Sequence, residues 1–175
     1  MAAFIVGKEY GNETIPIYTD GSRNEQGVGA GLAMFSGNKL VTTLKYRLDN
    51  RCSNNQAEQL VIAKALEALE KTDIKKNRPR TAAIITDSKI SLDSMMNVNN
   101  HSYLIEDIRK RLSKLERSNW AVTFVWVKSH AGILGNELAD RLAKTVARDE
   151  DMTTSFSRIT LSTLFRELGE ESKLK

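Results

Sequence analysis

Alternating apolar and polar positions in the first part of the chain predict three neighbouring strands. The segment Thr14–Thr19 alternates and runs into a turn that begins at Asp20, so the first strand should stop there. A glycine-rich stretch over 27–31 leads into an apolar run over 32–35, and a further strand is predicted over 40–46, after the pair Gly37-Asn38. Gly-Asn between two apolar runs is typical of a tight hairpin. We therefore expect an antiparallel meander of three strands.

Helical periodicity dominates the rest of the chain. Ser53, followed three residues later by Gln56, has the pattern of a capping box and predicts that a helix starts there. The apolar runs over 82–85 and 120–127 are typical of strands that are buried on both faces. Further helices are predicted over 88–96, over 103–115 and from the cap Asn136 onward.

This order of elements predicts an α/β fold with a five-stranded mixed sheet, three antiparallel strands followed by two parallel ones, and helices on both faces. We expect this domain to span residues 12–149, after an N-terminal extension over 1–11. Acidic residues and a Ser/Thr-rich stretch follow Arg148 and mark the boundary of a tail over 150–175. Apolar positions from Leu161 to Leu168 predict a short amphipathic helix in that tail.

Composition narrows the class of protein. The chain has 175 residues, enough for one domain with a continuous core, and its 41% hydrophobic and 27% charged residues are typical of a globular protein. Cys52 is the single cysteine, so no disulfide can form within the chain. This cysteine usage, with no signal-like start, predicts an intracellular location, in the cytoplasm or the nucleus. No apolar run is long enough to predict a membrane span, and we expect a monomer.

The net charge of +4 favours a polyanionic partner. Two basic groups contribute to this charge, and each can equally be a solvated loop or helix face. Their members are Lys75, Lys76, Arg78 and Arg80, and then Arg109, Lys110, Arg111 and Lys114.

Five residues that are far apart in the sequence should meet at one edge of the predicted sheet. Asp20 ends the first strand and Asp87 ends the fourth. Glu58 falls in the second turn of the first helix, Asp140 in the first turns of the helix after the fifth strand, and His130 in the loop between that strand and helix. Parallel strands joined by crossovers end at the same edge, where ligand sites of such sheets gather.

Each of these residues, taken alone, also suits an ordinary structural role. Asp20 suits a turn and Asp87 a helix cap. Glu58 and Asp140 suit solvated charges on helices, and His130 a hydrogen-bonded loop residue. Two carboxylates about 4 Å apart, however, repel each other by roughly 4 kcal/mol near a protein surface, so a group of four requires protonation or cations.

The ligand chemistry of such a group favours hard cations. Oxygen ligands, with a single histidine and no cysteine nearby, favour Mg²⁺ or Mn²⁺. Two such ions about 3.5 to 4 Å apart are a known arrangement for in-line displacement at a phosphodiester. As an imidazole on a loop beside the carboxylates, His130 could shuttle protons or help the product to leave.

Four motifs in this order resemble those of type 1 ribonuclease H. They are Tyr18-Thr19-Asp20-Gly21-Ser22, Asn54-Asn55-Gln56-Ala57-Glu58, Ile85-Thr86-Asp87-Ser88, and Ser129-His130-Ala131-Gly132 followed by Gly135 to Asp140. The resemblance covers about residues 12–149. The sequence around His130, with GNELADRLAK after it, is most similar to the ribonuclease H domains in polyproteins of non-LTR retrotransposons.

The resemblance implies a metal-dependent endonuclease that cuts the RNA strand of an RNA/DNA hybrid, leaving a 3′-hydroxyl and a 5′-phosphate. It implies that Asp20, Glu58, Asp87 and Asp140 bind two Mg²⁺ ions, with Mn²⁺ as a substitute, and that His130 is the loop histidine. A fused or associated reverse transcriptase would be a partner.

The resemblance also implies a hybrid-binding surface. Asn54 and Asn55 match positions that contact minor-groove edges and 2′-hydroxyls, and Arg51 and Ser53 match positions that hold a DNA-strand phosphate. The alternative for these four residues is that Ser53 is only a helix cap and the others are only polar. The basic, Trp-containing protrusion of many cellular members is missing, because only 97–102 separates the two middle helices. Hybrid affinity would then come from the two basic groups or from a fused polymerase.

Three other interpretations stay open at this point. A non-catalytic hybrid-binding module would keep the fold but should have lost a carboxylate, and all four are present. A DNA-cutting integrase or resolvase relative would keep the acidic group, but the Asn54-Asn55-Gln56 motif together with the His130 loop is not expected there. A retroelement domain that is weakly active in isolation would carry the same motifs.

Overall fold

The computed structural model describes residues 3–6, 10–73 and 78–173. Its strands are β1 (Ala3–Val6), β2 (Ile15–Asn24), β3 (Gly27–Ser36), β4 (Lys39–Leu48), β5 (Thr81–Thr86), β6 (Ala121–Trp126) and β7 (Thr154–Phe156). Its helices are α1 (Asn54–Glu70), α2 (Lys89–Met96), α3 (Tyr103–Arg117), α4 (Leu134–Arg148) and α5 (Leu161–Lys173). The strands form one sheet in the order β1-β6-β5-β2-β3-β4-β7.

The α/β fold with a mixed sheet is confirmed, but the predicted number of strands is wrong. The five inner strands are the expected ones: β2, β3 and β4 are antiparallel neighbours, and β5 and β6 are parallel to each other and to β2. Two short strands extend the edges, where β1 pairs in parallel with β6 and β7 with β4. The backbone of an existing strand aligns these short segments, so they need no alternating pattern of their own.

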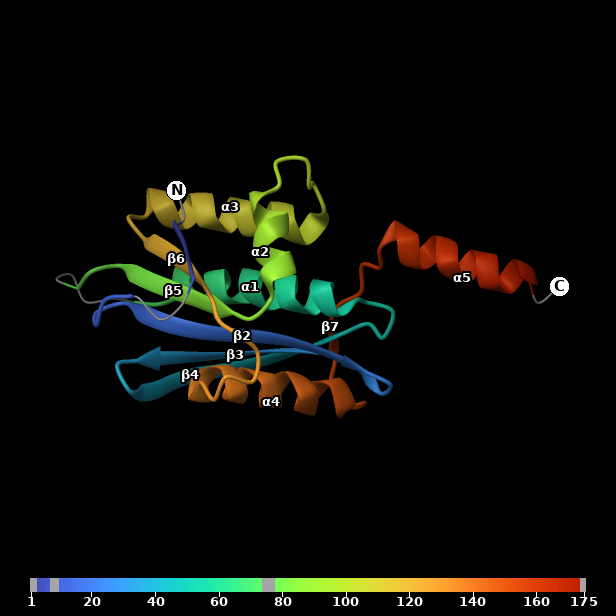
Figure 1. Ribbon diagram of the computed structural model, residues 1–175, viewed down its shortest axis with the longest axis horizontal. Coiled ribbons are helices and arrows are strands. Elements are labelled where there is room, and N and C mark those ends of the chain that lie inside the picture. Colours follow the sequence, from blue (N-terminus) through green and yellow to red (C-terminus); the bar gives the residue numbers. More distant parts are fainter. Residues whose placement is uncertain (1–2, 7–9, 74–77, 174–175) are drawn as a thin grey trace.

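The sheet lies between two helical layers (Figure 1). The larger hydrophobic core includes residues from the sheet and from α1, α2 and α3. Its largest fully buried side chains include Ile17, Leu32, Leu66, Ile84, Ile108 and Phe124. Helix α4 packs on the opposite face, mainly against β2 and β3, and α5 projects from one end of the molecule (Figure 1). None of the helices in the described part of the chain has the length and apolar character that a membrane span needs.

Two predicted boundaries are wrong for identifiable reasons. Strand β2 does not stop at Asp20, because the next four residues continue the ladder with β3, as far as the pair Asn24 and Gly27. Helix α4 does not begin after Asn136. It begins at Leu134, and the preceding Ile133 makes no capping hydrogen bond through its side chain. Asn136 is inside the first turn and buried.

The start of α1 is fixed by the predicted capping box. The Ser53 hydroxyl accepts a hydrogen bond from the Gln56 amide at 3.1 Å, and the Gln56 side-chain oxygen accepts one from the Ser53 amide at 3.0 Å. Two amides at the helix start are thereby satisfied. This contact fixes the position of the helical turn that carries Asn54 and Asn55.

Glycines in β3 allow α4 to lie almost in backbone contact with the sheet. A Cβ atom at Gly29 would lie 2.3 Å from the carbonyl oxygen of Ala143, and one at Gly31 would lie 2.6 Å from that of Ala139. Non-bonded atoms in folded proteins do not approach each other this closely, so only glycine fits at these two positions. The glycines therefore determine the depth at which α4, and with it Asp140, sits on the sheet.

Buried Arg47 of β4 fixes the other end of α4. Its guanidinium donates hydrogen bonds to the carbonyl oxygens of Val146, Ala147 and Asp149, at 3.2, 3.1 and 2.7 Å. These carbonyls belong to the last turn of α4 and its cap, where a cation is also favoured by the helix dipole. The sequence separation, about a hundred residues, explains why the pattern along the chain gives no sign of this contact.

Candidate active site

Three of the predicted carboxylates converge at the edge of the sheet. Asp20 of β2, Glu58 of α1 and Asp87, which follows β5, each place a carboxylate oxygen within 4.8 Å of the others. Gly21 makes this convergence possible, because a Cβ atom there would lie 2.7 Å from the Glu58 amide nitrogen. Asp20 and Glu58 are almost inaccessible, at 5% and 3% exposure. The three oxygens therefore face one another in a largely desolvated place.

Burial and mutual repulsion disfavour the charged forms of this group. Burial, with a further contribution from the charge of Asp87, raises the pKa of Asp20 to about 7. Burial also raises the pKa of Glu58 well above its ordinary range, and the charge of Asp20 adds to this. The Oε2 atom of Glu58 is buried and has no hydrogen-bond partner among the described residues. An all-oxygen donor set with an unsatisfied buried atom fits a hard divalent cation.

Asp140 lies beside this group and is not a member of it. It projects from α4 into the same cavity, and its carboxyl is close enough to contribute to the raised pKa of Asp20. Its Oδ2 atom is paired with the ammonium of Lys144, one helical turn further along, at 2.8 Å. The fourth predicted carboxylate is therefore at the site, with a lysine as its present counterion.

The loop after β6 reaches the same cavity. Ser129 donates a hydrogen bond from its hydroxyl to the Asp87 carboxylate at 2.6 Å, and the Trp126 indole donates to the Asp87 carbonyl at 3.1 Å. His130 follows, exposed, with a φ of 53°. This left-handed backbone conformation is uncommon for a residue other than glycine, and it occurs here at a residue that lines the cavity.

Sequence reasoning missed two residues of this site. The motif around His130 gives Ser129 no role of its own, yet Ser129 is the hydrogen-bond partner of Asp87. The sequence predicts Asn136 as a helix cap, but it lines the cavity, is only 4% exposed, and its Oδ1 atom has no partner among the described residues. Its spacing of four residues from Asp140 on one helix was the available signal, since such residues share a face.

The predicted substrate-contacting residues divide into two pairs. Asn54 and Asn55 are exposed in the first turn of α1 and line the cavity. Arg51 and Ser53 precede them and are not part of its lining. Arg51 is paired with Asp49 at 3.0 Å, with its side chain 51% exposed. The cavity has a volume of about 540 Å³ and brings together Asp20, Glu58, Asp87, Asp140, His130, Asn54 and Asn55.

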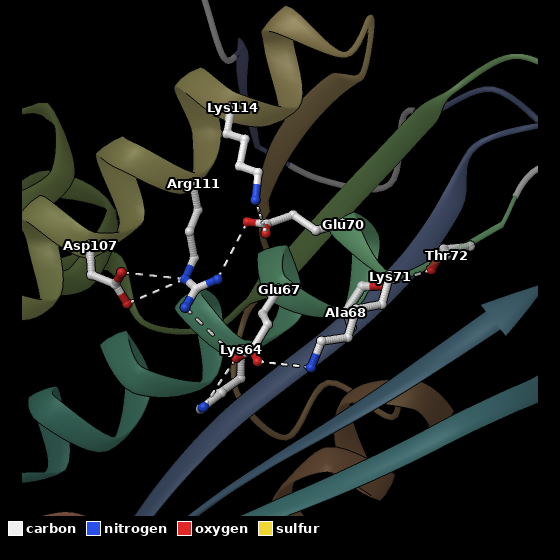
Figure 2. A network of polar contacts seen from close by, with 9 residues as sticks. All are labelled: Lys64, Glu67, Ala68, Glu70, Lys71, Thr72, Asp107, Arg111 and Lys114. Atoms are coloured by element: carbon white, nitrogen blue, oxygen red, sulfur yellow. Dashed lines mark hydrogen bonds and ion pairs between the residues drawn. The ribbon is translucent and has the colours of Figure 1, made fainter.

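Two of the four cations of the second predicted basic group, Arg111 and Lys114, form ion pairs with acids of α1. Figure 2 shows Arg111 of α3 in contact with Asp107 and with Glu67 and Glu70 of α1. Lys114 contacts Glu70 as well, at 3.2 Å (Figure 2). These ion pairs join α1 to α3, so their charges are largely compensated locally.

Other basic residues contact backbone carbonyls, line the cavity or lie outside the described residues. Arg109 donates hydrogen bonds to the carbonyl oxygens of the loop between α2 and α3, including Asn97 at 2.7 Å. In the first basic group, Arg80 donates to the Ser118 carbonyl, and Lys75 and Lys76 lie outside the described residues. At the cavity itself, Arg23 and Lys89 contribute to the lining, and neither forms an ion pair within the described part of the chain.

The RNase H family model matches residues 12–148 of the chain. The chain belongs to the ribonuclease H family. It is 33% identical over 144 residues to the ribonuclease H of Maricaulis maris (strain MCS10), an alignment that covers 75% of this chain and 91% of that protein. It is 32% identical to the ribonuclease H of Pseudoalteromonas translucida (strain TAC 125), covering 80% and 94%. Ribonuclease H1 of Homo sapiens is 26% identical, covering 81% and 53%.

Family membership makes this chain a ribonuclease H-type enzyme. Members of the family generally depend on divalent metal ions, and the carboxylates of Asp20, Glu58 and Asp87, the first two of them buried, could bind such an ion. The family match thereby confirms the predicted ribonuclease H-like fold class. The roles of individual residues are proposals, which the geometry supports to different degrees.

The raised pKa of Asp20 leads to an expected pH dependence of stability in metal chelator. Asp20 titrates near 3.8 in the unfolded chain and near 7 in the fold, so between these values the folded state binds more protons. The stability gained from proton binding by Asp20 is complete below about pH 4 and is lost as the pH rises through about 7. The asparagine in Asp20→Asn does not titrate, so the variant does not lose stability in this way. Above pH 7 it should therefore unfold at a higher temperature than the wild type.

The comparison needs thermal unfolding curves of both proteins, recorded by circular dichroism from pH 4.5 to pH 8. The advantage of Asp20→Asn should shrink steadily as the pH falls, because the wild-type carboxyl becomes protonated. Asp151→Asn, at an exposed carboxylate of the tail, is the matched control and should follow the wild type. An advantage that is independent of pH would contradict the expected titration of Asp20.

Proposed function

We propose that this chain is a metal-dependent endonuclease that hydrolyses the RNA strand of RNA/DNA hybrids. The observation that carries the proposal is the convergence of Asp20, Glu58 and Asp87 around an unsatisfied buried oxygen, in a cavity whose wall includes Asn54 and Asn55. Two Mg²⁺ ions are the proposed cofactors, with Mn²⁺ as a substitute, because the ligands are all hard oxygen donors.

The four carboxylates have distinct proposed tasks. Asp20, Glu58 and Asp87 would hold the metal ions, and Asp140, which is paired with Lys144 in the structure, would complete the ligand set from α4. Bound metal ions supply an activated water and stabilise the leaving oxygen of an in-line displacement. The Ser129 hydroxyl keeps the Asp87 carboxylate oriented.

His130 is proposed to move protons at the cavity wall and to help the product to leave. Its imidazole is exposed, so it can exchange protons with solvent, and it does not belong to the carboxylate group. This position supports a role in the rate of the reaction and not in metal binding.

Recognition of the hybrid is proposed for the start of α1. The side-chain amides of Asn54 and Asn55 are exposed beside the carboxylates and can both donate and accept hydrogen bonds, as a 2′-hydroxyl requires. Arg51 and Ser53 are proposed to hold a phosphate of the DNA strand. The pairing of Arg51 with Asp49 orients its guanidinium and leaves half of the side chain accessible.

The proposed context is a reverse transcriptase polyprotein of a non-LTR retrotransposon. The motif from Gly135 to Lys144 supports this origin, as does the short loop over 97–102 in place of a basic protrusion. Residues 12–149 would be the ribonuclease H domain, after the extension over 1–11, with 150–175 as its tail. An intracellular location and a monomeric state, with the reverse transcriptase as the partner, complete the proposal.

A labelled-hybrid assay tests the function directly. The purified chain should cleave the RNA strand of an RNA/DNA hybrid when Mg²⁺ or Mn²⁺ is present, and should leave single-stranded RNA and duplex DNA intact. Cleavage that persists in chelator would contradict the metal mechanism. Cutting of duplex DNA would favour the integrase or resolvase alternative, and hybrid binding without cleavage would favour a non-catalytic module.

His130→Ala should slow cleavage by roughly a hundredfold without abolishing it, the size expected for loss of a proton-transferring group. The metal ligands are untouched, so Mg²⁺ binding measured by calorimetry should match that of the wild type. His101→Ala, on the loop between α2 and α3, is the control for loss of an exposed imidazole and should not slow cleavage. Loss of metal binding in His130→Ala would show that the role is misassigned.

A further inference from the structure

The chain beyond residue 148, where the family match ends, returns to the domain and contacts the start of α1. Strand β7 pairs with the end of β4, and the Phe156 carbonyl accepts a hydrogen bond from the Asp49 amide at 2.8 Å. The Phe156 ring is partly buried against the main core and lies 6.1 Å from the Tyr103 ring of α3. The segment over 154–158 is therefore anchored to both β4 and α3.

Arg158 makes the contact that reaches the hybrid-binding motif. Its carbonyl oxygen accepts a hydrogen bond from the Gln56 side-chain nitrogen at 2.7 Å, and its guanidinium stacks 3.9 Å from the centre of the Tyr103 ring. The other polar atom of the same Gln56 side chain accepts from the Ser53 amide. One glutamine thus connects the tail to the residue that caps α1.

We propose that residues 154–158 are a positioning segment for hybrid binding. The segment fixes the loop over 49–53 and the first turn of α1, and thereby the residues Asn54 and Asn55 that are proposed to contact the hybrid. This inference rests on the proposed function and assigns a task to a part of the chain that the family match does not include.

The contacts of the segment predict a change in binding and not in chemistry. If the segment detaches, the Asp49 amide and the Gln56 side-chain nitrogen lose their partners. The start of α1 then has to be ordered when the hybrid binds, which weakens binding. The carboxylates of Asp20 and Asp87 lie on other elements, and Glu58 stays close to β2 through Gly21. The metal site should therefore be retained.

Two double variants of the full chain test the proposal. Phe156→Ala/Arg158→Ala removes both side-chain anchors, and Phe165→Ala/Arg166→Ala makes the same changes on exposed positions of α5. Both lose one positive charge, so general attraction to nucleic acid is matched. We expect the first variant to raise the KM for the hybrid about tenfold with kcat within twofold of the wild type. The second should leave both parameters unchanged.

Amide hydrogen exchange gives a readout that does not depend on activity. In Phe156→Ala/Arg158→Ala, the amides of residues 53–57 should exchange faster than in the α5 control, while those of the central strands do not change. If the double variant does not fold, Arg158→Ala alone provides the test, because it changes only an exposed side chain. It should show a smaller increase in KM, restored by Arg158→Lys, which retains a cation over Tyr103.

An unchanged KM and unchanged exchange in Phe156→Ala/Arg158→Ala would overturn the proposal. A lower unfolding temperature with an unchanged KM would also overturn it, because the segment would then be only a structural support. If the wild type does not cleave the hybrid at all, the proposed function fails. Faster exchange at residues 53–57 would then still establish that the segment orders this turn.

Discussion

Asp20→Asn should reduce hybrid cleavage by roughly a thousandfold or more, the largest effect that we expect from one substitution. Asp20 shares the carboxylate group with Glu58 and Asp87 and is 5% exposed, so water cannot easily take the place of its missing ligand oxygen. The side chains have the same shape, and removing a charge relieves repulsion, so the fold should be retained. Single-turnover cleavage of a labelled hybrid in Mg²⁺ provides the measurement.

The same variant should show a clear loss of Mg²⁺ binding heat in calorimetry, because asparagine offers a neutral oxygen in place of a carboxylate. Asp151→Asn changes an equivalent charge on the exposed tail and is the control for both measurements. Wild-type cleavage by Asp20→Asn would exclude the carboxylate group as the catalytic centre. Loss of cleavage together with loss of the folded state would shift the explanation to stability.

Gly29→Ala should lower the free energy of unfolding by about 3 kcal/mol, although it adds a single methyl group. The new carbon would lie 2.3 Å from the Ala143 carbonyl oxygen and 2.7 Å from the Ala147 amide nitrogen. Both neighbours are backbone atoms of α4, so no side-chain rotation can relieve the overlap, and the helix itself has to shift. Urea denaturation followed by circular dichroism measures the loss.

Gly11→Ala is the matched control for this substitution. Its nearest neighbour, the Thr14 hydroxyl oxygen, would lie 3.8 Å away, an ordinary contact, so stability should change by no more than about 0.5 kcal/mol. A shifted α4 also displaces Asp140, so Gly29→Ala should need more Mg²⁺ for half-maximal cleavage. Stability equal to that of the control would mean that α4 is not seated as closely on β3 as the structure indicates.

Features determined by short-range patterns could be predicted from the sequence. The alternation before Asp20 and the capping box of Ser53 and Gln56 depend on neighbouring residues, and both appear in the structure. The direction of each strand followed from the connections, which placed Glu58 and Asp87 at the same edge as Asp20. Long-range polar contacts could not be predicted in this way, because the interaction of Arg47 with the end of α4 joins two segments with no common pattern.

Asn136 shows how the same local reasoning goes wrong. An asparagine before an amphipathic stretch is a favourable cap. The helix, however, starts at Leu134, two residues before Asn136, and the Asn136 side chain lines the cavity instead. The charges of Arg111 and Lys114 are a second example. Their clustering in sequence is compatible with a nucleic-acid surface or with a solvated helix face, whereas their contacts with acids on α1 depend on how two helices pack.

The two added strands also determine how a fragment of this chain would behave. Strands β1 and β7 both lie outside residues 12–148, and each pairs with an outer strand of the five-stranded core. A fragment cut at the limits of the family match would leave backbone groups of β6 and β4 unpaired at opposite sides of the sheet. Unprotected edges of this kind recruit strands from other molecules. Such a fragment should therefore self-associate, and low activity in it would reflect aggregation and the loss of residues 154–158, and not the chemistry of the site.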